Sequence, residues 1–158
     1  MKLYFVRHTT PADSAVSDAK RPLTPQGEEE ARVVGAALAS MNIQPTRILS
    51  SPLLRACQTA AIIGRELKFA GTTKPIDELT NGSPTASLLL AIHPVVADGE
   101  VILVGHMPSL AEHVAELTNG RGSSDFAFGK GSVACIELPQ SNSSRGKLQW
   151  FKHLPQFR

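Results

Sequence analysis

The chain has 158 residues, of which 42% are apolar and 19% charged, and its formal net charge is +2. This length fits one domain, 1–158, with a single buried core. The charge is too small to argue for binding to nucleic acid or to an anionic membrane, and the basic residues are scattered. We therefore expect neither partner, and any functional cluster of charge must be local. The sequence indicates no oligomeric state.

The N-terminal sequence and the cysteines indicate a cytoplasmic protein. No stretch approaches the roughly 18 apolar residues of a membrane span. The opening MKLYFVRH reaches an arginine and a histidine too early for a secretory signal. Cys57 and Cys135 form neither a C-x-x-C pair nor a zinc-type spacing, and their apolar surroundings predict buried free thiols.

The first half of the chain predicts strands separated by helices. A buried strand is expected over 2–6, followed by an irregular polar stretch over 7–23. Thr24-Pro25 is typical of a helix start, and the apolar face of that helix begins at Ala31. A second strand is expected over 46–50. Ser51-Pro52 repeats the start signal before a helix whose apolar residues continue to Leu67.

The second half of the chain continues the alternation of strands and helices and ends with two consecutive strands. A third strand is expected over 75–79, and Ser83-Pro84 opens a helix through 92. A buried strand over 100–104 precedes a helix over 109–117 that ends at Asn119-Gly120. Two last strands, 132–138 and 147–152, bracket the turn-rich segment 140–146. This order predicts a single three-layer α/β domain, with a mostly parallel central sheet flanked by helices and an antiparallel edge near the C-terminus.

Polar residues suited to an anion follow three of the predicted strands. Arg7-His8 ends the first strand, the segment 50–55 (SSPLLR) follows the second, and Gly105-His106 ends the strand over 100–104. Ligand sites of open α/β sheets lie beyond the carboxyl ends of strands. One histidine after a strand more often caps or packs than catalyses. Three strand ends that offer residues for one anion indicate a shared crevice.

The chemistry that this set suits is phosphoryl transfer. The guanidinium groups of Arg7 and Arg55 can hold phosphoryl oxygens bidentately, and the start of the helix around Arg55 also favours an anion. His8 can act as the nucleophile if one ring nitrogen is protonated and fixed, which leaves the lone pair of the other for phosphorus. His106 would donate to a phosphoryl oxygen. This set requires no metal and no cofactor.

The motifs resemble those of the histidine phosphatase superfamily, which includes the cofactor-dependent phosphoglycerate mutases. The resemblance runs from residue 2 to about residue 117 and includes Arg-His after the first strand, SSPLLRACQTA over 50–60 and GHMP over 105–108. The segment RPLTPQG over 21–27 also resembles the family. It implies a phosphoglycerate mutase-like fold in which Arg7, Arg21 and Arg55 bind phosphate, His8 is phosphorylated and His106 assists. Arg21 and the short chain resemble the bacterial SixA-type phosphohistidine phosphatases.

Two positions of the predicted site stay open. The family commonly has glycine after the nucleophilic histidine, whereas this chain has Thr9, which would either narrow the pocket or add a hydrogen bond to phosphate. The second open position is that of the acid that protonates the leaving group. In the mutase branch of the family a glutamate follows the third strand; Glu78, near the end of the third predicted strand, stands at a similar place, and Asp18 in the loop before Arg21 is the competitor.

The substrate expected from this site is phosphohistidine on a partner protein. Imidazole, with a pKa of roughly 6.5, leaves phosphorus far more readily than an alkoxide and depends less on an acid. No insertion is long enough for a lid, so the crevice should admit a side chain presented by another protein. A small phosphate ester is the alternative substrate. A non-catalytic module that docks phosphorylated partners is a weaker hypothesis, and a mutase would need a longer chain.

Other phosphate chemistries fail on spacing. Neither Cys57 nor Cys135 has arginine six residues on, and the glycines around Lys130 do not fit a phosphate-binding loop. His106 and His113 are seven residues apart, and His113 is predicted on the exposed side of its helix, which disfavours a metallohydrolase. No G-x-G-x-x-G is present for a dinucleotide. The aromatic residues of the C-terminal part are predicted to pack in the core or hairpin, namely Phe126, Phe128, Trp150 and Phe151; the alternative for Phe126 and Phe128 is that they line the approach of a substrate.

Overall fold

A computed structural model describes residues 1–93, 99–118, 122–139 and 143–158. The strands form one sheet in the order β3-β2-β4-β1-β5-β6. β1, β2, β3 and β4 run parallel, whereas β5 is antiparallel to β1 and β6 is antiparallel to β5. The bounds of the strands are Lys2–Arg7 (β1), Arg47–Ser50 (β2), Lys74–Pro75 (β3), Glu100–Gly105 (β4), Val133–Glu137 (β5) and Lys147–Lys152 (β6).

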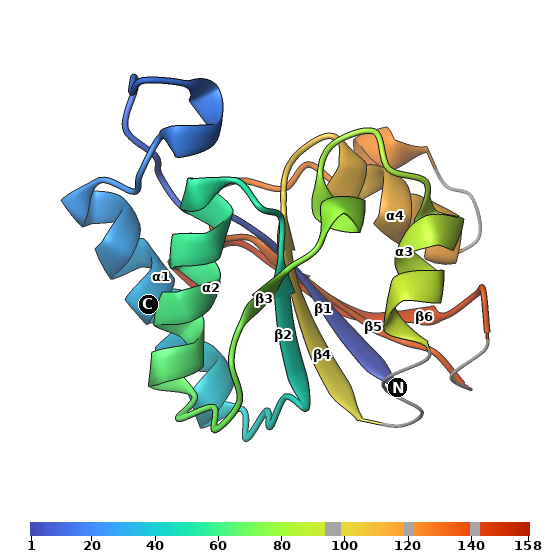
Figure 1. Cartoon of the computed structure of the whole chain (residues 1–158). Helices are drawn as coiled ribbons and strands as arrows, with labels where there is room; N and C mark the ends of the chain where they lie inside the picture. Colours follow the sequence, from blue (N-terminus) through green and yellow to red (C-terminus); the bar gives the residue numbers. More distant parts are fainter. Residues whose placement is uncertain (94–98, 119–121, 140–142) are drawn as a thin grey trace.

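Helices cover both faces of the sheet (Figure 1). α1 (Pro25–Ser40) and α2 (Leu54–Glu66) lie on one face, and α3 (Thr85–Ile92) and α4 (Ser109–Leu117) lie on the other. β1 shows why both are needed: Leu3 and Phe5 pack with α3 and α4, whereas Tyr4 and Val6 pack with α1 and α2. Successive side chains of a strand point to opposite faces, so a strand that is apolar throughout must be covered twice. The predicted three-layer architecture with its antiparallel C-terminal edge is confirmed.

The third predicted strand is wrong over most of its length. β3 has only two residues, and Asp77–Leu79 form a short 3₁₀ helix, η2. The last sheet contact is the amide of Ile76, which donates to the carbonyl of Ser50 at 2.8 Å. Pro75 has no N–H for the sheet, which is compatible with an edge strand and unfavourable for extending it. The chain therefore turns before Glu78.

Two helices begin later than their start signals predict. α2 begins at Leu54, because Ser51 still belongs to the sheet edge and its amide donates to the carbonyl of Val104 at 2.9 Å. α3 begins at Thr85 rather than Ser83. The end predicted for α4 at Asn119-Gly120 lies outside the described residues, as does part of the turn-rich segment 140–146.

The start of α1 is fastened against the segment that follows β1. Thr24 caps the helix by accepting the amide of Gly27 at 3.0 Å, and its own amide donates to the carbonyl of Thr10 at 3.1 Å. A Cβ atom at Gly27 would lie 2.1 Å from the Thr10 oxygen, so only glycine fits this contact. The chain just after His8 is thereby held in place by a helix on another part of the sequence.

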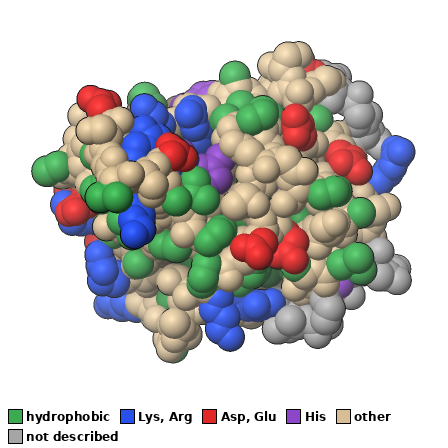
Figure 2. Space-filling model, turned by 45° about the horizontal axis from the view of Figure 1, so that its top comes forward, with side chains coloured by type: hydrophobic (Ala, Val, Ile, Leu, Met, Phe, Trp, Pro, Cys, Tyr) green, Lys and Arg blue, Asp and Glu red, His purple; other side chains and the backbone are tan. Residues whose placement is uncertain are grey.

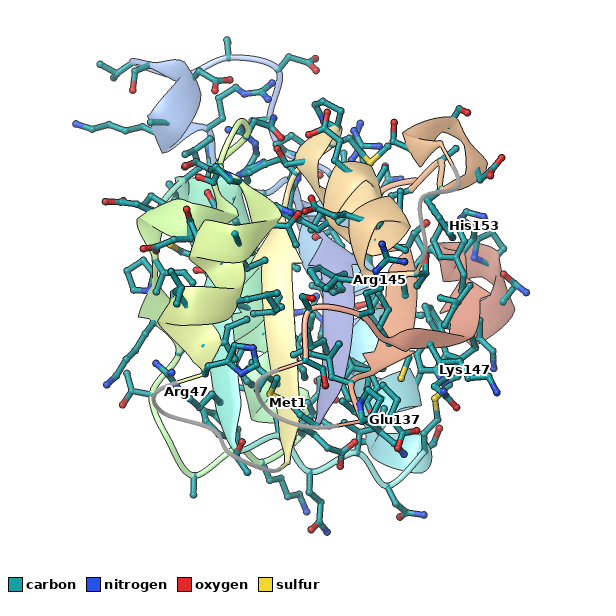
Figure 3. The ribbon with its side chains drawn as sticks, turned by 90° about the vertical axis from the view of Figure 1, so that its right-hand side faces the viewer. Met1, Arg47, Glu137, Arg145, Lys147 and His153 are labelled. Atoms are coloured by element: carbon teal, nitrogen blue, oxygen red, sulfur yellow. The ribbon has the colours of Figure 1, made fainter. Side chains whose placement is uncertain are left out.

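His113 is buried in α4, which corrects its predicted exposure. The side chain is 2% exposed, and its Nδ1 lies 2.7 Å from the hydroxyl of Thr85. Burial lowers the pKa of His113 to about 4. α4 packs against both α3 and the sheet (Figure 3), so its buried arc is wider than the sequence pattern of one apolar face indicates.

The cysteines and aromatic residues agree largely with their predicted packing. Both thiols are free; Cys135 is buried and Cys57 is half-buried. Phe126 and Phe128 are buried against Phe151, with ring centroids 6.0 and 4.8 Å away. Within the described residues, no helix is long and apolar enough to cross a membrane.

Candidate active site

The three predicted strand ends meet in one pocket. β4 lies between β1 and β2, so the residues that follow these strands share the same edge of the sheet. The strand-end pocket has a volume of about 360 Å³ and opens on the face shown in Figure 2, where a histidine lies in a hollow beside basic side chains. Its lining residues are Arg7, His8, Thr10, Pro11, Asp13, Arg21, Arg55, Asn81, His106, Met107 and Lys130.

The proton of His8 is fixed by the backbone. Its Nδ1 lies 2.8 Å from the carbonyl oxygen of Thr9. A carbonyl only accepts, so Nδ1 carries the hydrogen and Nε2 of the neutral ring keeps its lone pair. Burial lowers the pKa of His8 to about 3, and the charges of His106, Arg55 and Arg7 act in the same direction. At neutral pH His8 is therefore an uncharged imidazole with a free lone pair on Nε2.

The guanidinium of Arg7 is anchored from the C-terminal part of the chain. Its Nη1 donates to the carbonyl of Phe128 at 2.9 Å. The turn after Phe128 is closed by Ser132, whose hydroxyl accepts the amide of Gly129 at 2.9 Å and lies 2.7 Å from Nδ1 of His153. His153 follows β6 directly and is labelled in Figure 3. Segments far apart in sequence thus fix one arginine at the pocket.

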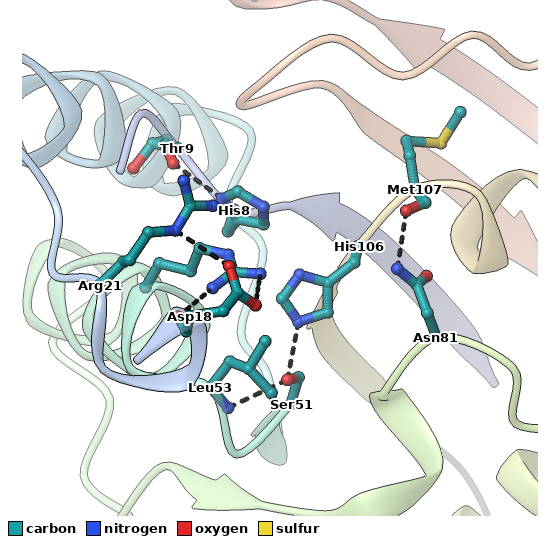
Figure 4. Close-up of polar contacts among 10 residues, drawn as sticks. His8, Thr9, Asp18, Arg21, Ser51, Leu53, Asn81, His106 and Met107 are labelled. Carbon is teal, nitrogen blue, oxygen red and sulfur yellow. Dashed lines mark hydrogen bonds and ion pairs between the residues drawn. The ribbon is translucent and has the colours of Figure 1, made fainter. Parts of the chain in front are cut away.

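Two further arginines share one carboxylate (Figure 4). Arg55, in the first turn of α2, donates from Nη1 to the carbonyl of Asp18 at 2.9 Å and from Nη2 to its carboxylate at 3.3 Å. The Nε of Arg21 lies 3.1 Å from the other carboxylate oxygen. The side chain of Asp18 is 69% exposed, whereas that of Arg55 is 9% exposed. An exposed anion is therefore already held between two guanidinium groups.

His106 faces His8 across the pocket. The ring centroids are 5.0 Å apart, and Nε2 of His106 lies 2.7 Å from the hydroxyl of Ser51. Burial lowers the pKa of His106 to about 4; the charge of Arg55 adds to this effect, and that of Asp18 opposes it. Nearby, Asn81 joins η2 to the loop after β4, because its amide donates to the carbonyl of Met107 at 2.8 Å.

The structure places two predicted site residues outside the pocket. Thr9 is fully buried, and its hydroxyl donates to the carbonyl of Gly27 at 2.7 Å, so it neither narrows the pocket nor reaches a ligand. Its amide donates to the hydroxyl of Thr59, which turns the residue toward the helices. Glu78 is half-buried in η2 and does not line the pocket, because β3 ends early.

The sequence does not single out two loop residues that line the pocket, Asn81 and Lys130, or the role of the buried Ser51 beside His106. In the sequence Ser51 has the pattern of a helix start, and only its contact with His106 in the structure indicates another role. Asn81 and Lys130 lie in loops that gave no signal of their own. The glycines that flank Lys130 do not fit a phosphate-binding loop, yet Lys130 lines this pocket.

The charge of the pocket suits an oxyanion. Four of its lining residues are basic, namely Arg7, Arg21, Arg55 and Lys130, and one, Asp13, is acidic. In the described parts of the chain, no three His, Cys, Asp or Glu side chains gather as ligands of a metal ion would. Guanidinium groups are suited to the bidentate binding of phosphate.

Comparison with known proteins agrees with this geometry. The family model described as the histidine phosphatase superfamily (branch 1) matches residues 3–82. The phosphohistidine phosphatase SixA of Escherichia coli (strain K12) is 29% identical over 152 residues, which cover 95% of this chain and 92% of that protein.

Solved structures extend the likeness to the whole fold. A structure of the protein histidine phosphatase SixA complexed with tungstate superposes with a TM-score of 0.90 at 28% identity and covers 100% of both chains. A SixA-type structure from Nakamurella multipartita, described as a putative phosphohistidine phosphatase, has a TM-score of 0.80 at 25% identity and covers 96% of this chain and 95% of its own. The chain belongs to the histidine phosphatase superfamily, and it is homologous to SixA, a hydrolase of that superfamily.

Proposed function

We propose that this protein is a metal-independent phosphatase that forms a phosphohistidine intermediate on His8 and removes phosphate from phosphohistidine of a partner protein. The observation that carries the proposal is the pairing of Nδ1 of His8 with the Thr9 carbonyl, which leaves Nε2 as a nucleophile beside three arginines. The likeness to SixA supports the same substrate.

The reaction consists of two displacements at phosphorus. In the first, the lone pair of His8 Nε2 forms a bond to phosphorus, and the bond from phosphorus to the leaving nitrogen breaks with its electron pair; the substrate ring, which carries a hydrogen on its other nitrogen, leaves as neutral imidazole. Arg7, Arg21 and Arg55 hold the phosphoryl oxygens, and His106 donates a hydrogen bond to one of them. In the second, water attacks phosphorus and loses a proton to solvent. Inorganic phosphate leaves, and the lone pair returns to Nε2.

The Asp18 carboxylate must move away from Arg21 and Arg55 before these arginines can bind a phosphoryl group. This carboxylate contacts Arg21 and Arg55, the groups that would hold the phosphoryl oxygens. The side chain is mostly exposed and can move into solvent without losing a packed environment. We assign Arg21 and Arg55 to phosphate binding and treat Asp18 as the internal anion that an incoming phosphoryl group displaces.

The leaving group favours phosphohistidine over an alkyl ester. Glu78, the counterpart of the mutase-type acid, does not line the pocket. Imidazole departs readily because its pKa is roughly 6.5, whereas an alkoxide needs a placed acid. The pocket also opens to the surface in Figure 2, which suits a side chain presented by another protein.

A substrate panel tests the proposal. The wild-type chain and His8→Ala are assayed on a phosphohistidine-containing protein and on small phosphate esters in the presence of a chelator. We expect the wild-type chain to cleave phosphohistidine faster, with no effect of the chelator, and His8→Ala to be inactive. Ready cleavage of esters with phosphohistidine left intact would support the alternative, a small-molecule phosphomonoesterase. Binding of phosphorylated partners without turnover would indicate a non-catalytic module.

A further inference from the structure

Ser51 sits between the backbone of its own loop and the imidazole of His106. It follows β2 directly and is fully buried. Its hydroxyl oxygen accepts the amide of Leu53 at 3.1 Å and lies 2.7 Å from Nε2 of His106 (Figure 4). The other nitrogen of the His106 ring, Nδ1, lies on the side turned toward His8 in that view. Ser51 thus touches the nitrogen that is turned away from His8.

Counting hydrogens decides which of the two groups donates. A serine hydroxyl has one hydrogen and two lone pairs, and the Leu53 amide uses one lone pair. If the hydroxyl donates to Nε2 of His106, its one hydrogen has an acceptor and both of its contacts are hydrogen bonds. If Nε2 donated instead, the hydroxyl hydrogen would need another acceptor, and the described residues provide none within hydrogen-bond distance. A buried donor without a partner costs roughly 1–3 kcal/mol.

The protonation state of His106 makes the direction matter. Burial and the charge of Arg55 lower the pKa of His106 to about 4, so at neutral pH the ring carries a single hydrogen. That hydrogen can stay on Nε2, where it faces Ser51, or on Nδ1, where it faces the pocket. Only the second tautomer lets a neutral imidazole donate to a phosphoryl oxygen; the first would present a lone pair to an anion.

We propose that Ser51 is the positioning residue of His106: its hydroxyl donates to Nε2 and thereby holds the single hydrogen of the neutral ring on Nδ1, facing the phosphoryl group. The catalytic consequence rests on the proposed function, whereas the tautomer does not. The hydrogen of each neutral ring is then held on Nδ1, in His8 by an acceptor at Nδ1 and in His106 by a donor at Nε2. A backbone acceptor fixes the hydrogen on Nδ1 of His8 and frees a lone pair to attack, and a side-chain donor occupies Nε2 of His106 and frees an N–H to stabilise charge.

The tautomer can be measured without any substrate. In protein labelled with nitrogen-15 in histidine, the shifts and couplings of each ring distinguish a protonated from an unprotonated nitrogen, and loss of signals in His106→Gln assigns the ring. Near neutral pH we expect Nδ1 of His106 to be protonated and Nε2 unprotonated in the wild-type chain. In Ser51→Ala we expect the Nε2–H form to become populated. A wild-type ring protonated on Nε2, or a tautomer unchanged in Ser51→Ala, would overturn the proposal.

Measuring kcat in Ser51→Ala and in a matched control variant tests the same proposal through activity. Removing a donor to a developing oxyanion costs about 10²–10³-fold in kcat, so loss of the residue that positions the donor should cost on the order of 10- to 100-fold, mainly in kcat rather than KM. Ser50→Ala is the control, because Ser50 is buried one residue earlier, and its hydroxyl contacts Cys57 Sγ at 3.6 Å and neither histidine. Equal losses of kcat in Ser50→Ala and Ser51→Ala would contradict the proposal.

The pH dependence separates a tautomer effect from a packing defect. A doubly protonated His106 donates from Nδ1 whatever Ser51 does. The kcat deficit of Ser51→Ala should therefore narrow as the pH falls toward about 5, because loss of the Ser51 contact lets His106 accept a proton more readily. A deficit that stays constant with pH would indicate packing alone. If Ser51→Ala folds poorly, Ser51→Cys serves in its place, because the thiol is close in size to the hydroxyl and is a weak donor. The kcat of Ser51→Cys should be lower than that of the wild-type chain by less than the loss expected for Ser51→Ala.

The outcomes also separate this proposal from the proposed function. If the wild-type chain turns over neither phosphohistidine nor phosphate esters but His106 is protonated on Nδ1, the proposed function fails and the role of Ser51 in setting the tautomer stands. If the wild-type chain is active but His106 is protonated on Nε2, the proposed function stands and the role of Ser51 fails.

Discussion

The imidazole rings of His8 and His106 face one another with centroids 5.0 Å apart, and burial lowers the pKa of both. Two adjacent imidazolium ions would repel each other and the three nearby arginines. A pair of neutral rings is the arrangement that this basic pocket tolerates. Neutrality is also what a nitrogen nucleophile needs, so the environment that keeps both rings neutral suits His8 to its proposed role.

The first prediction concerns the titration of these rings. The pKa values are lowered to about 3 for His8 and about 4 for His106, so each ring stays neutral as the pH falls from 8 through 6 and protonates only below about 5. Histidine ring signals followed by NMR across this range should show no midpoint near 6.5 for either residue. A midpoint near 6.5 for His8 would contradict a buried His8 that is neutral near pH 7.

The second prediction concerns acid stability and His113. Its folded pKa of about 4 lies below the unfolded value of roughly 6.5, so between these values the unfolded chain binds the extra proton. The free energy of unfolding should therefore fall as the pH drops below about 6.5, with His113 contributing a loss of about 2 kcal/mol at pH 5.

His113→Gln isolates this contribution, because glutamine can still contact Thr85 and does not titrate in this range. Urea unfolding is measured at several pH values for both chains. The variant should lose less stability than the wild-type chain between pH 7 and 5. Parallel losses in the two chains would contradict a neutral, buried His113.

The third prediction concerns the internal anion. Asp18 contacts Arg21 and Arg55 and so competes with an incoming oxyanion for the same guanidinium groups. Asp18→Asn should therefore bind inorganic phosphate several-fold more tightly, as measured by calorimetry. The control is Asp13→Asn, which removes the same charge from a residue that lines the pocket. Equal gains in the two variants would indicate a general charge effect rather than competition at the arginines.

The fourth prediction concerns the contact between α1 and the segment after His8. In Gly27→Ala the new methyl group would lie 2.1 Å from the Thr10 oxygen, so the helix start must move. Overpacking of this kind typically costs about 1–3 kcal/mol, and activity should fall as well because the chain after His8 shifts.

Gly64→Ala in α2 is the matched control, since its methyl group would meet only ordinary contacts at 3.5 Å. Alanine is favoured over glycine inside a helix by up to about 1 kcal/mol, so this variant should be as stable as the wild-type chain or more stable. Thermal unfolding of both variants checks the pair. A Gly27→Ala chain as stable as Gly64→Ala would contradict the close contact.

The sequence predicts the site best where topology alone assembles it. Arg7, His8 and His106 lie at or just beyond the ends of strands that an alternating pattern makes parallel, and parallel strands end at one edge of the sheet. The orientation of Thr9 could not be predicted from the sequence. Its side chain is turned toward Gly27 and Thr59 by the packing of α1 and α2, which the local sequence does not encode. Glu78 misses the pocket because β3 ends at Pro75, and strand ends are poorly fixed by local pattern.

The most direct test of the account is to identify the phosphorylated atom. The enzyme is mixed rapidly with a labelled phosphohistidine protein, quenched in alkali to preserve phosphohistidine, and the labelled peptide is located by mass spectrometry. We predict phosphate on Nε2 of His8 in the wild-type chain and no label in His8→Ala. Label on His106 or on any other residue, or label that persists in His8→Ala, would contradict the assignment of His8 as the nucleophile.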